Sequence, residues 1–319
     1  MLKLTDNDFE RLVTYMKKTY GITLDKKRVL IEGRLSNMIS TRGFKSFKEY
    51  IDFAFADKTG NETMQLVNKL TTNHTFFMRE PEHFQYLKKT ILPYFEKQNA
   101  ATRTLDLWCA ASSTGQEPYT IVMTIDDYFG ANAARWKVNL LATDLDTDVL
   151  AKAKAGVYTI DMMKDVPKEW LAKYFTKVDA TTYKVIDRLR NQITFKQFNL
   201  MNNITERKQY DLISCRNVMI YFEQDTKNAL VERFFDVTKE GGYLFTGHAE
   251  SVGRDTRYTY VQPAVYRKIS GKAAAGKSSL TGSTLPKSST GSTLPKSTVG
   301  STLPKSTLPG SKISGGIKR

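Results

Sequence analysis

Short apolar segments alternate with amphipathic stretches from about residue 102 to residue 268, and this pattern strongly constrains the fold. Such alternation is typical of a parallel sheet with helices on both faces. The last two segments are close together and predict an antiparallel hairpin. We therefore expect a doubly wound α/β domain whose ligands bind at the carboxyl ends of the strands, where the chain order reverses. The predicted strands are Thr104–Cys109, Val138–Thr143, Ile193–Phe198, Tyr210–Cys215, Gly242–Thr246, Tyr258–Gln262 and Ala264–Arg267.

Residues 1–72 have a different pattern, in which apolar side chains recur at helical spacing. Thr5 is placed to cap a first helix that carries apolar residues from Phe9 to Tyr20 and ends at Gly21. Further helices are predicted from about residue 25 to 41, from Ser46 onward, and from about residue 61 to 71. The second helical stretch is basic, which indicates either a solvated face or a docking surface for an acidic partner. Its cations are Lys26, Lys27, Arg28, Arg34 and Arg42.

The segment after Lys268 loses all hydrophobic periodicity. The sequence Gly-Ser-Thr-Leu-Pro-Lys-Ser recurs from Gly282, Gly291 and Gly300, and nothing there can form a core. From Lys268 onward the chain carries +9 of the total net charge of +15, so the overall basicity does not by itself indicate nucleic-acid binding. We predict a disordered basic tail over residues 269–319, which acts as a solvated linker or as an electrostatic tether.

Composition also limits the cellular setting. No run of about 18 apolar residues is present, and the N-terminus has no apolar signal region, so we expect a cytoplasmic protein without membrane insertion. The two cysteines, Cys109 and Cys215, fall in strand-like runs and are expected to be buried thiols. The three histidines have no metal-ligand spacing, so no metal is predicted.

The first predicted strand is followed by small residues from Ala110 to Gly115 and then by a helical pattern. This arrangement points backbone N–H groups at a ligand. No lysine follows Gly115, so a Walker-type loop is not expected. The second strand ends at Asp144, where a carboxylate can accept bonds from ribose hydroxyls, whereas Asp146 is better placed to cap the next helix. The turn and the acid together fit a dinucleotide or S-adenosylmethionine.

Two later strands are also followed by polar residues. Asn199 and Leu200 come after one strand, where short polar contacts could grip an adenine. Arg216, Asn217 and Tyr221 come after the next one, where a methyltransferase would hold the transferring methyl group and its acceptor. Both elements favour S-adenosylmethionine, although from spacing alone the second one fits ordinary loop structure equally well.

Four segments of the chain resemble the chemotaxis receptor methyltransferases, the CheR family, and the resemblance covers about residues 5–268. These segments are 73–80 (NHTFFMRE), 113–119 (STGQEPY), 142–146 (ATDLD) and 215–222 (CRNVMIYF). The resemblance implies a Rossmann-like methyltransferase domain at residues 102–268, with a small β-subdomain inserted between about residues 158 and 189. It also implies an all-α receptor-docking domain at residues 1–72 and an inter-domain segment with a helix, residues 73–101, beside the cofactor.

The resemblance further implies the roles of particular residues. Arg79 and Tyr221 match positions beside the acceptor. We expect Arg79 to hold the carboxylate of the cofactor and Tyr221 to orient the acceptor, because a tight grip on the acceptor would stabilise the ground state. The residues matched to cofactor contacts are Asn73, Thr75, Arg79, Glu117, Asp144, Asn199, Leu200, Arg216 and Asn217.

Two positions depart from the family pattern. Ala111 stands where the family often has glycine. Alanine narrows the range of backbone φ angles allowed at this position, because only glycine enters positive φ freely. Met78 stands where an aromatic residue commonly precedes the arginine. Neither change removes a charged or hydrogen-bonding group, so we expect activity to be retained.

The implied reaction transfers a methyl group from S-adenosylmethionine to glutamate side chains of chemotaxis receptors, which gives glutamate methyl esters and S-adenosylhomocysteine. A glutamate carboxylate is already ionised at neutral pH, so no general base is required. The implied partner is the acidic helical signalling domain of a receptor, and such a partner would dock on the basic second helix. We expect the protein to be a monomer. The alternatives are a methyltransferase that acts on nucleic acid or a small molecule, and a non-catalytic cofactor-binding scaffold.

Overall fold

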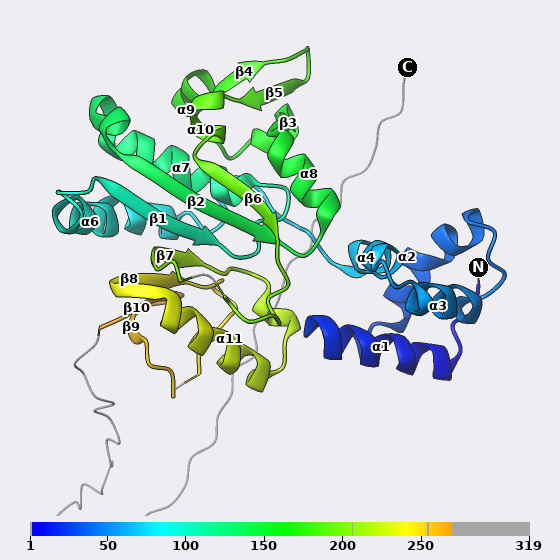
Figure 1. Ribbon diagram of the computed structural model, residues 1–319. Coiled ribbons are helices and arrows are strands. Elements are labelled where there is room, and N and C mark those ends of the chain that lie inside the picture. Colours follow the sequence, from blue (N-terminus) through cyan, green and yellow to red (C-terminus); the bar gives the residue numbers. More distant parts are fainter. Residues whose placement is uncertain (1, 206, 254, 270–319) are drawn as a thin grey trace, which may run out of the picture. The chain divides into compact units, whose positions relative to one another are not determined.

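In the computed structural model, which describes residues 2–205, 207–253 and 255–269, the predicted strands form a seven-stranded sheet (Figure 1). The strand order is β6-β2-β1-β7-β8-β10-β9. β1 pairs in parallel with β2 and β7, and β10 pairs antiparallel with β8 and β9. The chain order therefore reverses between β1 and β7. The strands are β1 Thr104–Cys109, β2 Lys137–Asp144, β6 Ile193–Gln197, β7 Tyr210–Ser214, β8 Thr238–Phe245, β9 Thr259–Gln262 and β10 Val265–Arg267.

Helices cover both faces of this sheet. Successive side chains of a strand point to opposite faces. Leu105, Leu107 and Cys109 of β1 accordingly pack in one apolar core with α5, α6 and α7, while Trp108 packs in a second core with α11. This arrangement confirms the predicted doubly wound α/β fold. The helices are α5 Glu82–Tyr86, the π-helical turn η1 Leu87–Ile91, α6 Leu92–Gln98, α7 Gln116–Phe129, the 3-10 turn η2 Gly130–Arg135, α8 Thr147–Ala155 and α11 Gln224–Val237.

The first four helices have an apolar core of their own, which includes the fully buried Leu12, Ile31 and Phe47. The predicted cap is present, since Thr5 Oγ1 accepts a bond from the backbone N of Asp8 at 3.2 Å. The second helix begins later than predicted. The helices are α1 Asp6–Tyr20, α2 Arg28–Thr41, α3 Phe47–Ala56 and α4 Asn61–Leu70.

The end of α1 lies against the loop that follows β6. Gly21 ends the helix with φ 72°, and a Cβ added there would meet Met201 Sδ at 2.6 Å. Only glycine satisfies both the positive φ and this close approach. The all-α region and the sheet region are thus in direct contact at one edge of the site described below.

A small three-stranded sheet, of order β3-β5-β4, lies between α8 and β6 in the sequence. Asp126 of α7 anchors this insert through Arg188 and through Lys173, whose Nζ lies 3.2 Å from the carboxylate. The family-implied β-subdomain is therefore present. Its elements are β3 Val157–Thr159, η3 Ile160–Met163, α9 Lys168–Tyr174, β4 Phe175–Lys177, β5 Thr182–Val185 and α10 Asp187–Arg190.

The predicted tail, residues 269–319, lies outside the described residues apart from Ile269. Within the described ranges, no helix combines the length and the apolar character that crossing a bilayer would require.

Candidate active site

A cavity of about 270 Å³ opens at the carboxyl ends of β1, β2 and β7, beside the point where the strand order reverses. Residues of the all-α region, among them Tyr20, Leu24 and Leu70, form part of its wall. The cavity brings together all the residues predicted for the cofactor and the acceptor. These are Asn73, Thr75, Arg79, Glu117, Asp144, Asn199, Leu200, Arg216, Asn217 and Tyr221.

The turn after β1 contributes Ala110, Ala111 and Ser113 to the wall of the cavity. Ser113 has φ 45° and Gly115 has φ 96°, whereas Ala111 is not among the residues with positive φ. The loss of the family's glycine at Ala111 therefore imposes no backbone strain. Gly115 is constrained more tightly, because a Cβ there would meet the Tyr158 hydroxyl at 2.7 Å and Ala153 Cα at 3.0 Å.

Asp144 ends β2 with its carboxylate at the cavity. Its Oδ2 accepts a bond from the backbone N of Ser113 at 2.8 Å, and its Oδ1 accepts one from Asp146 N at 3.0 Å. Burial raises the pKa of Asp144 to about 6. Asp146 caps α8, as its position in the sequence indicated, by accepting bonds from Asp148 N and Val149 N. The ribose contact of Asp144 remains a prediction.

Glu117 and Arg216 form an ion pair at the floor of the cavity. Glu117 Oε2 lies 2.9 Å from Arg216 Nη1, and Glu117 Oε1 accepts a bond from Ser214 Oγ at 2.5 Å. The guanidinium lies over the Phe84 ring, and its Nη2 donates to the backbone oxygen of Arg79. The pair thus joins the first turn of α7 to the loop after β7 and to the segment that leads into α5.

The segment 73–80 crosses the top of the cavity. Asn73 Nδ2 donates to Asp146 Oδ2 at 2.7 Å, and Ser113 Oγ donates to the backbone oxygen of Asn73 at 3.0 Å. Arg79 Nη1 donates to the backbone oxygen of His74 at 2.7 Å. None of the described carboxylates pairs with Arg79, so its guanidinium remains available for an anionic group.

The opposite side of the cavity connects to the all-α region. Asn199 Nδ2 donates to the backbone oxygen of Thr19 at 2.8 Å, and Met201 N donates to Asn199 Oδ1 at 3.0 Å. The backbone N of Thr23 donates to the backbone oxygen of Tyr221 at 2.9 Å. Both ends of the Asn199 amide therefore have partners within the chain, which leaves its predicted adenine contact as a prediction.

Comparison with known proteins agrees with this architecture. Residues 7–71 match the family described as "CheR methyltransferase, all-alpha domain", and residues 73–266 match "CheR methyltransferase, SAM binding domain". A chemotaxis protein methyltransferase of Borreliella burgdorferi is 38% identical over 272 residues, which cover 84% of this chain and 96% of the relative. One from Escherichia coli is 35% identical over 271 residues, which cover 83% of this chain and 92% of the relative.

This chain belongs to the CheR methyltransferase family. It is an S-adenosylmethionine-dependent methyltransferase, as the resemblance predicted. The residues around the cavity fit that cofactor. Each Asp144 oxygen already accepts one backbone bond and retains acceptor capacity for a hydroxyl, Arg79 is available for a carboxylate, and apolar side chains such as Leu200 and Phe222 can flank a base.

The five cations predicted to dock a partner on this CheR protein divide into two groups. Three of them already have partners in the all-α region: Arg28 pairs with Asp6, Arg34 donates to the backbone oxygens of residues 70 and 71, and Arg42 pairs with Glu62. Lys26 and Lys27 precede α2 and have no side-chain partner among the described residues. Lys27 also lines the cavity.

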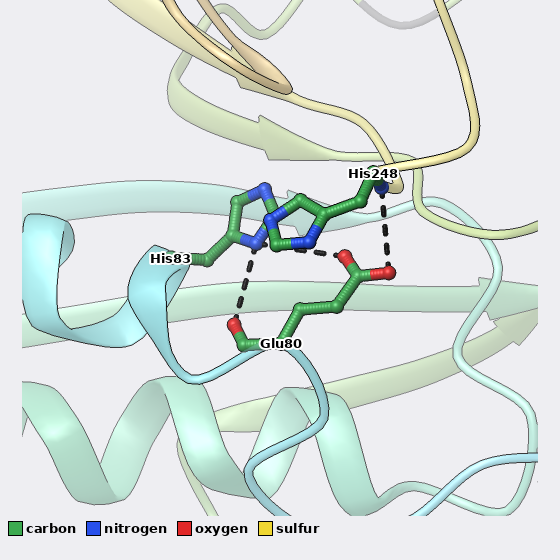
Figure 2. A group of neighbouring side chains, drawn as sticks. All are labelled: Glu80, His83 and His248. Atoms are coloured by element: carbon green, nitrogen blue, oxygen red, sulfur yellow. Dashed lines mark hydrogen bonds and ion pairs between the residues drawn. The ribbon is translucent and has the colours of Figure 1, made fainter. Parts of the chain in front are cut away.

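Sequence reasoning missed four residues behind the cavity: Glu80, His83, His248 and Glu250. Figure 2 shows His83 and His248 beside Glu80. One potential ligand atom from each of these three residues lies within 4.8 Å of the other two. The imidazoles of His83 and His248 stack with centroids 5.1 Å apart. Because 164 positions separate these histidines, no spacing rule could have found the group.

The residue types of this group would suit a metal, but its hydrogen bonds indicate another role. Glu80 Oε2 lies 3.1 Å from Arg216 Nη2, and Glu80 Oε1 accepts from Asn217 Nδ2 at 3.1 Å and from His248 N at 3.3 Å. A cation bound there would face the Arg216 guanidinium. Burial, followed by the charge of Arg216, lowers the pKa of His83. We therefore interpret the group as a support for the loop that follows β7.

Proposed function

We propose that this CheR protein transfers methyl groups from S-adenosylmethionine to glutamate side chains in the acidic helical signalling domain of chemotaxis receptors. The products are glutamate methyl esters and S-adenosylhomocysteine. The observation that carries the proposal is the charge around the cavity. Arg79 and Lys27 line it without a carboxylate partner among the described residues, so the cavity can take up anionic groups.

The proposed acceptor explains why the site can work without a general base. A glutamate side chain is ionised at neutral pH and attacks as it stands. When bound, S-adenosylmethionine supplies a methyl group on a positively charged sulfur. The chain then has to align the two reacting groups and exclude water, and alignment alone contributes roughly 7–11 kcal/mol in well-oriented reactions.

Each residue around the cavity has a role in this proposal. Arg79 holds the carboxylate of the cofactor, Asp144 accepts the ribose hydroxyls, and Tyr221 orients the incoming glutamate. Thr75 contacts the cofactor beside Arg79, while Glu117, Arg216 and Asn217 form the floor beneath it. Asn199 and Leu200 flank the base. Asn73 contributes through the bond that ties it to Asp146.

Lys26 and Lys27 steer the acidic receptor toward the cavity in this proposal, since both lie on the all-α region and neither is neutralised by a described carboxylate. Arg28, Arg34 and Arg42 contribute more weakly because each also supports the fold. The enzyme acts as a monomer in the cytoplasm, where the buried free thiols of Cys109 and Cys215 remain reduced.

The test is incubation of the purified protein with methyl-labelled S-adenosylmethionine and either receptor signalling fragments or RNA. We expect label in the receptor fragment, located on glutamate by mass spectrometry and released by mild base as an ester would be. Base-stable label, or label in RNA alone, would contradict the proposed acceptor. A protein that binds neither S-adenosylmethionine nor S-adenosylhomocysteine would contradict the proposal as a whole.

A further inference from the structure

Asn217 is held in an unusual conformation at the floor of the cavity. Its φ is 59°, in the left-handed region that asparagine tolerates better than most residues. Its backbone N donates to Glu250 Oε2 at 2.8 Å, and its side-chain Nδ2 donates to Glu80 Oε1 at 3.1 Å. Two carboxylates from distant segments thus hold the backbone and the side chain of one residue.

Glu250 supports the loop around Asn217 through backbone bonds. It is buried, its Oε2 also accepts from Gly247 N at 2.6 Å, and its Oε1 accepts from Ile220 N at 3.2 Å. The carboxylate therefore accepts backbone bonds from Asn217 and Ile220, the two residues that flank positions 218 and 219. Ile220 directly precedes Tyr221, so the same carboxylate also supports the residue proposed to orient the acceptor.

Glu80 holds Asn217 from the other side. It lies in the segment that crosses the top of the cavity, directly after Arg79, and its own φ is 55°. Its second oxygen is 3.1 Å from Arg216 Nη2. Bonds from Asn217 and Arg216 lower the pKa of Glu80 although burial acts in the opposite direction, so Glu80 is ionised at neutral pH.

Gly247 completes the enclosure of Asn217. A Cβ added at Gly247 would meet the amide nitrogen of the Asn217 side chain, Glu250 Oε2 at 2.9 Å and Asn217 N at 3.0 Å. Any larger residue would therefore displace either Asn217 or the carboxylate that bonds it.

These contacts decide which end of the Asn217 amide is free. The NH₂ group is committed to Glu80, and none of the described residues donates to Oδ1, while Asn217 lines the cavity. We propose that Glu80 and Glu250 are positioning residues that fix Asn217 with its Oδ1 toward the positively charged, methyl-bearing sulfur of the cofactor. The inference rests on the proposed function only in placing that sulfur in this cavity.

The physical basis is that a carbonyl oxygen attracts a positive sulfonium and the polarised C–H groups of its methyl. S-adenosylhomocysteine lacks both the charge and the methyl group. An oxygen fixed beside the sulfur therefore favours S-adenosylmethionine over its product, and it restrains the methyl group for in-line transfer.

The test measures the affinity of the full chain for S-adenosylmethionine and for S-adenosylhomocysteine by calorimetry. The variants are Asn217→Ala, Glu80→Gln, Glu250→Gln and the double variant Glu80→Gln/Asn217→Ala. A glutamine has a single acceptor oxygen where each carboxylate uses two, so either substitution leaves donors facing its amide group. We expect each single variant to weaken S-adenosylmethionine binding roughly tenfold, with S-adenosylhomocysteine binding changed by no more than about twofold.

The double variant separates positioning from an independent effect. The quantity compared is the ratio of the affinities for S-adenosylmethionine and S-adenosylhomocysteine. If Glu80 acts through Asn217, this ratio is the same in the double variant as in Asn217→Ala alone. Asp211→Asn is the control, because Asp211 is a buried, ion-paired carboxylate that does not line the cavity. Its ratio of affinities for S-adenosylmethionine and S-adenosylhomocysteine should match that of the wild type.

Equal loss of affinity for both ligands in Glu80→Gln and Glu250→Gln, or additive losses in the double variant, would overturn the inference. If either variant fails to fold, the other carboxylate variant and Gly247→Ala carry the same test. Because neither ligand is the receptor, a negative result here is distinct from a failure of the proposed acceptor assay.

Discussion

The carboxylate of Glu117 lies 2.9 Å from Arg216 at the carboxyl end of the sheet, and both side chains are largely removed from solvent, with 13% and 1% exposed. This pair joins the first turn of α7 to the loop after β7. A buried ion pair contributes little net stability while it is intact, but the loss of one partner leaves an uncompensated charge.

Glu117→Gln leaves the buried Arg216 guanidinium with Glu80 as its remaining carboxylate partner among the described residues. The substitution should therefore lower the free energy of unfolding of the ligand-free protein by about 1–3 kcal/mol. Urea denaturation monitored by circular dichroism measures this change. Glu232→Gln is the control, because Glu232 pairs with Arg257 at 2.5 Å on the surface and should contribute less than about 1 kcal/mol. Similar midpoints for the two variants would show that the Glu117 pair is not effectively buried.

The pKa of Asp144 should determine how cofactor affinity changes with pH. Burial raises its pKa to about 6, and we expect the ionised form to accept the ribose hydroxyls. The affinity for S-adenosylhomocysteine should hence be constant above about pH 7 and fall below about pH 6, by at most about tenfold per pH unit. Calorimetry between pH 5 and 8 tests this, and Asp144→Asn should bind weakly with a flatter profile.

The same pKa shift has a consequence for stability, with the opposite dependence on pH. The folded state holds the Asp144 proton more tightly than the unfolded state, so this group makes the ligand-free protein less stable as pH rises from about 4 to about 6. Asp144→Asn should lack this contribution. Identical pH profiles of the melting temperature in wild type and Asp144→Asn would contradict the raised pKa.

Arg79 and Tyr221 should have separable effects on binding and rate. Arg79→Ala removes the cation proposed to hold the cofactor's carboxylate and should weaken S-adenosylhomocysteine binding roughly 10- to 100-fold. Tyr221→Phe should leave this affinity unchanged and lower kcat for receptor methylation roughly tenfold. Tyr260→Phe, at an exposed site, controls for the loss of a hydroxyl. If Tyr221→Phe instead weakened S-adenosylhomocysteine binding and Arg79→Ala lowered only kcat, Tyr221 would hold the cofactor and Arg79 would orient the acceptor.

Lys26 and Lys27, which have no side-chain partner among the described residues, should govern receptor docking. The double variant Lys26→Glu/Lys27→Glu should raise KM for the receptor fragment roughly tenfold and weaken its dependence on salt, with an unchanged melting temperature. Lys45→Glu/Lys58→Glu makes the same charge change at exposed sites that do not line the cavity. Equal effects of the two double variants would indicate a response to net charge alone.

Arg34→Ala should behave differently from the lysine variants. Arg34 donates to the backbone oxygens of residues 70 and 71 at 2.9 and 2.8 Å, where α4 ends and the segment 73–80 approaches. Its loss should lower stability by about 1–2 kcal/mol, measured by thermal unfolding, and should change KM less than the lysine double variant does. A normal melting temperature with a raised KM would instead make Arg34 a docking residue.

Local sequence patterns predicted most of the secondary structure. β1 has the bounds expected from its apolar run, and Asp146 caps α8 as its position indicated. The errors have local causes. α2 begins at Arg28 because a turn bond from Lys27 N to the backbone oxygen of Leu24 precedes it. β8 begins at Thr238 although Gly241 has φ 76°, and the glycine pair there resembles a turn in sequence.

The sequence by itself determined the doubly wound fold and the all-α region, because apolar periodicity is encoded by neighbouring residues. The strand ends indicated the polar residues Asp144, Asn199, Arg216 and Asn217. Asn73, Thr75, Arg79 and Glu117 were predicted only from the resemblance to a known family. Only the tertiary structure showed that Glu80 and Glu250 bond to Asn217, and that Arg28, Arg34 and Arg42 have partners within the fold. Such contacts join residues far apart in the chain. They depend on how loops pack at the end of the sheet, which no local pattern specifies.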